Sequence, residues 1–88
     1  MLVLLVVTFA SIANNYDVNK EYLQKFAKHL KKIRKEKKLT QDDLVSDTVF
    51  RSMISLIEIV KTDLTISTAK SIADALHISM KELFDFEE

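Results

Sequence analysis

Few residues of this chain could carry out covalent or metal chemistry. The sequence contains no Cys and no Gly, and its only histidines are His29 and His77. Disulfides, thiolate metal sites and glycine-rich phosphate loops are therefore excluded, and two distant histidines do not predict a zinc site. A Ser–His–Asp group can be drawn from Asp74, His77 and Ser79, but helix termini explain Ser79 and His77 better. We therefore predict no enzyme activity, no cofactor and no metal site.

A second group of side chains could recognise nucleic acid. The planar guanidinium of Arg51 can bind O6 and N7 of guanine together, and such a contact discriminates between bases by about 1–3 kcal/mol. Ser52 and Ser55 are short donors or acceptors that suit base or backbone contacts. Phe50 and Leu56 add apolar surface, which suits thymine methyl groups and a protein partner equally well.

The charge of the chain is unevenly distributed, although it sums to zero. Residues 20–38 carry nine basic side chains against two acidic ones, a net charge of +7, whereas residues 39–88 carry −6. A lysine-rich helix alone is usually a solvated face. Beside a candidate recognition element, the same lysines indicate a polyanionic partner that they would contact through phosphates.

The recognition residues fall within Thr40–Lys61, which is predicted to form two short helices with a tight bend between them. Thr40 and Asp43 have the spacing of a capping box, in which each side chain satisfies a free backbone N–H of the first turn. Leu44 and Val45 would supply the first short helix with an apolar face.

The second of these helices would restart near Thr48, which is predicted to cap it. Ile54 and Ile57 lie three residues apart and would form its inward stripe. This stripe leaves Arg51 and Leu56 on or near the opposite side, together with the two serines between them. Such a helix, braced by the short helix before it, has the layout that enters the DNA major groove.

A longer amphipathic helix is predicted to precede this element, over about residues 20–37. Arg34 is a cation at the edge of its apolar stripe, and we expect it to pair with Glu58, which is the only acid of the later helix. The stripe itself repeats with a period of 3.6 residues and comprises Tyr22, Leu23, Phe26, Ala27, Leu30, Ile33 and Arg34.

Two more helices are predicted after the central element. Thr65 would cap a helix over about residues 66–76, with Ile66, Ala69, Ile72, Ala73 and Leu76 on one face. Ser79 and Glu82 form a second capping-box pattern, with Met80, Leu83 and Phe84 turned inward. The sequence therefore predicts an all-α chain of five helices.

Residues 1–13 form an apolar run without charge. The run lacks the basic start of a secretory signal and is shorter than the roughly 20 residues that span a bilayer. We expect a strand or helix that packs either on its own domain or on a second copy, and we predict no membrane association. Residues 1–18 would thus be an N-terminal extension and turn, which forms a dimerisation segment if it packs on a second copy, and residues 19–88 the functional domain.

Five short motifs occur in a characteristic order and spacing: Leu30 with Ile33-Arg34, Leu39–Leu44, Arg51–Glu58, Ile72–Leu76 and Glu82–Phe84. In this respect the sequence resembles the phage-repressor helix-turn-helix family, also called Cro-like or XRE-like, over about two-thirds of the chain. The resemblance implies a five-helix bundle that binds operator DNA, usually as a homodimer, to regulate transcription. It also implies a cytoplasmic, nucleoid-associated protein.

The resemblance implies roles for several residues. Gln41 would hold a phosphate, beside Thr40 at the start of the first short helix. Arg51, Ser52 and Leu56 would face base edges, and Lys61 would reach the DNA backbone.

The chain departs from the family pattern in two ways. The bend is one residue shorter than usual, and Val60 stands where the family has glycine. The apolar side chains on the second short helix keep an alternative open, namely a protein-interaction module such as an antitoxin or a repressor antagonist.

Overall fold

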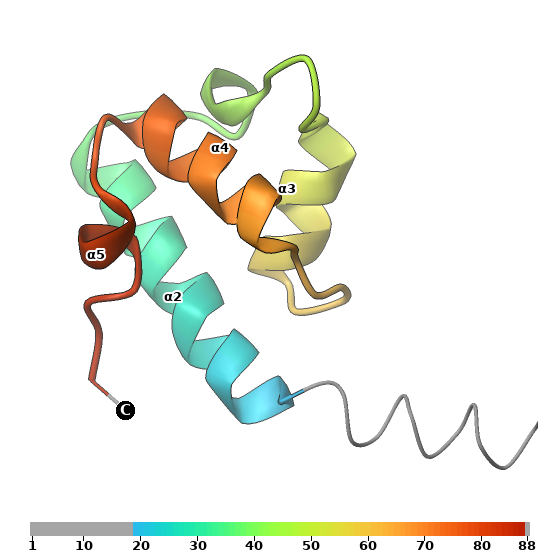
Figure 1. The fold of residues 1–88 in the computed structure, drawn as a ribbon, viewed down its shortest axis with the longest axis vertical. Coiled ribbons are helices and arrows are strands. Elements are labelled where there is room, and N and C mark those ends of the chain that lie inside the picture. The colour runs from blue at the N-terminus through green and yellow to red at the C-terminus, as the bar shows by residue number, and fades with distance from the viewer. Residues whose placement is uncertain (1–18, 88) are drawn as a thin grey trace, which may run out of the picture.

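The structure is a computed structural model that describes residues 19–87, and this part of the chain is all-α. The predicted extension and dimerisation segment, residues 1–18, lies outside the described residues. No described helix has the length and apolar character needed to cross a bilayer. The elements are α2 (Lys20–Glu36), one 3-10 turn, η1 (Asp42–Leu44), then α3 (Arg51–Glu58), α4 (Ile66–Leu76) and α5 (Met80–Leu83) (Figure 1).

Helix α2 forms where the period-3.6 apolar stripe predicts it. Its first turn is capped by Asn19, whose side-chain oxygen accepts a hydrogen bond from the backbone N–H of Tyr22 at 2.9 Å. The stripe buries Phe26, Ala27 and Leu30 and leaves most lysines exposed on the opposite side. One face of α2 therefore packs in the core.

Helices α4 and α5 also begin at their predicted caps. The Thr65 hydroxyl accepts from the Thr68 backbone N–H at 3.1 Å, and Ser79 and Glu82 form the reciprocal capping box. One prediction is wrong, because Ile66 is 82% exposed. It is the first residue of α4, and the buried face of that helix starts only at Ala69.

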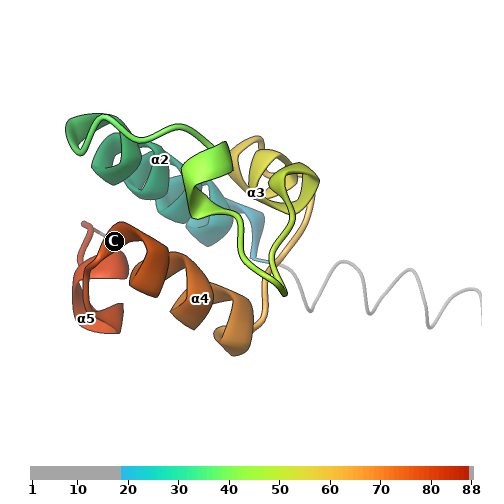
Figure 2. The ribbon, with the colours of Figure 1, turned by 90° about the horizontal axis from the view of Figure 1, so that it is seen from above.

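The core lies between these helices, with α3 and α5 on opposite sides of it (Figures 1 and 2). Helix α3 contacts α2, and α4 contacts both α5 and η1. The C-terminal residues pack back on α2, since the ring of Phe84 stacks on Phe26 at 5.1 Å and Phe86 lies 5.1 Å from Tyr22. The fully buried side chains come from every element: Phe26, Leu30, Leu44, Val49, Ile54, Ile72, Leu76 and Leu83.

The described residues hold four α-helices rather than the five predicted. The first short helix of the central element is only the three-residue turn η1, because Val45 is already extended at φ −70° and ψ 141°. Leu44 is buried as predicted, but Val45 is 42% exposed and does not share its face.

The predicted tight bend before α3 is wrong as well. Residues 45–50 form a loop in which Ser46 and Val49 exchange backbone hydrogen bonds of 2.9 and 3.3 Å. This turn places Val49 in the core, so the helix cannot start at Thr48 and begins at Arg51. Burial of one valine therefore outweighs the capping preference of a threonine.

Three helices end at residues with positive φ although the chain has no glycine. Lys38, Val60 and His77 adopt φ values of 61°, 59° and 58°. Each closes a Schellman-type pair of hydrogen bonds; after α3, the N–H groups of Val60 and Lys61 donate to the carbonyl oxygens of Ile57 and Leu56. Val60 is the most strained of the three, because a β-branched side chain is rarely tolerated in this region.

We expect Val60→Gly to raise the free energy of unfolding by about 1 kcal/mol, because glycine removes the Cβ clash of the left-handed conformation. Urea denaturation of both proteins measures the change. Ile59→Gly is the matched control, since Ile59 has φ −100° and glycine there should lower stability. Equal or lower stability of Val60→Gly would contradict the prediction.

Candidate nucleic-acid interface

Helix α3 presents two different faces. Ile54 and Ile57 are buried on the inner face, as predicted, and Glu58 beside them is only 4% exposed. Arg51 and Ser52 are exposed in the first turn of the helix. Leu56 is exposed on the outer face, and Ser55 is half-buried. The helix is thus fixed by one side and open to solvent on the other.

An ion pair between α2 and α3 fixes the inner face. The predicted pair is present: Arg34 Nε donates to Glu58 Oε2 at 2.8 Å, and Arg34 Nη2 donates to Oε1 at 3.0 Å. The third guanidinium nitrogen, Nη1, donates to the carbonyl oxygen of Leu39 at 3.0 Å. The hydrogen bond to Glu58, opposed by partial burial, raises the pKa of Arg34 above its ordinary value.

Gln41 adds a third segment to this contact. Its side-chain Nε2 donates to Glu58 Oε1 at 3.1 Å, and the residue is half-buried. The structure therefore places the Gln41 amide on a carboxylate within the protein. This contact was not predicted, and its only signal in the sequence is that Glu58 has more acceptor sites than Arg34 can fill. Because Glu58 receives hydrogen bonds from Arg34 and Gln41, its carboxylate ties α2, the segment before η1 and α3 together.

Thr40 and Asp43 form the predicted reciprocal contact around η1. Asp43 Oδ2 accepts from the Thr40 backbone N–H at 2.7 Å and from its hydroxyl at 3.0 Å, while the Asp43 N–H donates to the Thr40 hydroxyl oxygen at 3.3 Å. The hydrogen bonds from Thr40 hold the pKa of Asp43 below its ordinary value. Both residues are exposed, so the contact orders the turn at the protein surface.

The N-terminal end of α3 is exposed and has no side-chain cap. Phe50 occupies the capping position, where it offers no acceptor, and it is 63% exposed. Arg51 begins the helix, and its Nε lies 3.2 Å from Asp42 Oδ1. Asp42 was not among the predicted site residues. The C-terminal end of α3 is followed by Lys61, which is exposed as well.

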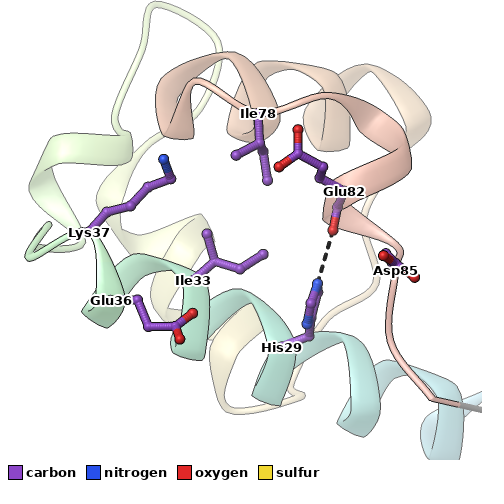
Figure 3. A pocket seen from close by; sticks show the side chains of 7 residues that line it. All are labelled: His29, Ile33, Glu36, Lys37, Ile78, Glu82 and Asp85. Carbon is purple, nitrogen blue, oxygen red and sulfur yellow. Dashed lines mark hydrogen bonds between the residues drawn. The ribbon is translucent and has the colours of Figure 1, made fainter.

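A separate cavity of about 350 Å³ lies between α2 and α5, and no residue of α3 lines it (Figure 3). His29 Nε2 lies 3.0 Å from the Glu82 carbonyl oxygen, to which it can donate, and Ile33 and Ile78 form the apolar part of the wall (Figure 3). Glu36, Lys37 and Asp85 complete the lining. No cluster of His, Cys, Asp and Glu in the described residues could hold a metal ion.

The three residues that resemble a hydrolytic group have other partners. Ser79 caps α5, and Asp74 pairs with Lys70 at 2.7 Å. His77 closes α4 through its backbone, and its side chain has no hydrogen bond to either of the other two. The described residues therefore contain no Ser–His–Asp arrangement at these positions.

We compared the chain with protein-family models, with curated proteins and with solved structures, and none of the three comparisons gave a match.

Proposed function

We propose that this protein is a sequence-specific DNA-binding regulator of transcription, in which α3 enters the major groove. The observation that carries the proposal is the exposed outer face of α3, with Arg51 at its first turn and the ion pair behind it. Together, η1 and α3 would act as a repressor-like helix-turn-helix unit with a shortened first helix. A phage repressor or a restriction–modification controller fits a domain of this kind, acting as a homodimer on an operator.

The dimensions of α3 suit this role. A helix with its side chains is about 10–12 Å in diameter, which fits a major groove about 12 Å wide, and the eight residues of α3 extend about 12 Å along its axis. Arg51 would bind a guanine, and Ser52, Ser55, Phe50 and Leu56 would contact neighbouring bases or sugars. Recognition helices read bases with their N-terminal residues, which is where Arg51 stands.

Phosphates would be held around this helix. The uncapped N–H groups in the first turn of α3 are suited to a phosphate oxygen, and so is the amide hydrogen of Gln41 that Glu58 does not use. Thr40 could join them only by releasing Asp43, to which both of its donors are bonded. Lys61 and the exposed lysines of α2 would add affinity without sequence choice.

Selection of bound duplexes from a random pool tests the proposal directly. We expect the wild-type protein to enrich a short motif containing guanine, with binding that weakens steeply as salt rises. Arg51→Ala should lose about 1–3 kcal/mol of discrimination at that guanine, whereas Lys61→Ala should weaken all sequences alike and lower the salt slope. The proposal is wrong if the wild-type protein retains no duplex at low salt.

A protein-interaction module is the second candidate, and the exposed apolar side chains favour it. Three large apolar side chains in or next to α3 are exposed, namely Phe50 (63%), Leu56 (43%) and Ile59 (55%). Val45, in the loop before the helix, is exposed as well. Several exposed acids, Asp42, Asp43 and Asp47, precede the helix in sequence. Co-purification of a protein partner, together with no thermal stabilisation by any duplex, would select this function over DNA binding.

A further inference from the structure

We propose that Asp42 is a specificity-determining residue that orients Arg51 for a guanine without itself contacting DNA. This inference rests on the proposed function. Its structural basis is the 3.2 Å approach of Asp42 Oδ1 to Arg51 Nε. A carboxylate at Nε leaves both terminal nitrogens of the guanidinium available, and these two donors can bind O6 and N7 of a guanine together.

The backbone that carries this carboxylate is held in place. Asp42 begins η1, and its carbonyl oxygen accepts from the Val45 N–H at 3.2 Å. On its two sides, Gln41 is bonded to Glu58 of α3, and Asp43 is bonded to Thr40. The side chains of three consecutive residues at η1 therefore contact other residues: Gln41 contacts Glu58, Asp43 contacts Thr40, and Asp42, between them, pairs with Arg51.

The pair is too exposed to serve mainly as a stabilising contact. The side chains of Arg51 and Asp42 are 66% and 71% exposed, and ion pairs at such positions add little to folding. Its effect is instead to reduce the freedom of a long, flexible side chain. Ordering such a side chain costs about 0.5–1.5 kcal/mol on binding, which corresponds to a factor of about 2 to 13.

The test measures Asp42→Ala on two duplexes that differ only at the guanine identified by selection with the wild-type protein. We expect the ratio of the two affinities to fall about 2- to 13-fold. At the same time, affinity for an unrelated duplex should rise, because a negative charge has been removed from the interface. Opposite movements of specificity and general affinity are the signature of an orienting carboxylate.

Asp47→Ala is the matched control, since it removes an exposed acid close by in the chain that forms no ion pair with Arg51. It should raise general affinity and leave the ratio unchanged. If Asp42→Ala raises both affinities and keeps the ratio, Asp42 merely masks Arg51 and the inference fails. Failure of the wild-type protein to bind any duplex overturns the proposed function itself, so the two failures are distinguishable.

Discussion

Replacing Glu58 by alanine should lower the free energy of unfolding by about 3–5 kcal/mol, the largest effect we expect from a single polar side chain. The change leaves the guanidinium of Arg34, whose side chain is 12% exposed, without its carboxylate partner. It also removes the acceptor of the Gln41 amide. Urea denaturation followed by circular dichroism at 222 nm measures the loss, which is a large part of the stability of a small domain.

A double substitution distinguishes the effect of the unpaired charge from the effect of lost packing. Arg34→Met combined with Glu58→Leu removes both charges and retains apolar volume, and replacements of this kind are often neutral or stabilising. We therefore expect the double variant to be much more stable than Glu58→Ala. If the double variant were as unstable as Glu58→Ala, the loss would come from packing rather than from an unpaired charge.

Leu44→Ala should cost about 2–5 kcal/mol, because it opens a cavity at a fully buried position. Leu44 is the one apolar anchor of η1 in the core, so its loss should also loosen the turn that carries Gln41 and Asp42. Thermal and urea denaturation measure the stability. Protection of backbone amides from hydrogen exchange would show whether η1 opens before the rest of the domain.

The neighbouring valine is a matched control for this prediction. Val45→Ala removes apolar carbon from a 42% exposed side chain and should change stability by no more than about 0.5 kcal/mol. Similar losses at both positions would mean that Leu44 is not the anchor, and that the two residues share one face as the sequence pattern had predicted.

Most of the fold could be predicted because its longer helices carry strong local signals. The period of apolar residues and the Thr65 and Ser79 caps locate α2, α4 and α5 to within a residue or two at each end. The region between α2 and α3 could not be predicted, because a capping pattern such as Thr40 with Asp43 fits a single 3-10 turn as well as a helix. Its length is decided by the burial of Leu44 and Val49, which depends on the whole core.

The contacts of the candidate site were likewise predictable only in part. A cation on an apolar stripe and a single acid on α3 were enough to predict the pair of Arg34 and Glu58. The contacts of Gln41 and Asp42 were not predictable, because they depend on the path of the loop over residues 45–50. Side chains that reach across a loop follow its conformation, for which the sequence has no periodic signal.

Lys38, Val60 and His77 adopt left-handed conformations, so glycine at each of these positions should raise the free energy of unfolding. Two of them, Lys38 and His77, lie outside α3 and its flanking loops, so glycine at these positions should raise thermal tolerance and leave the outer face of α3 unchanged, with one cation of residues 20–38 removed. Because the three helix ends are separate, their gains should accumulate when combined. Thermal tolerance and choice of ligand could therefore be adjusted independently in this scaffold.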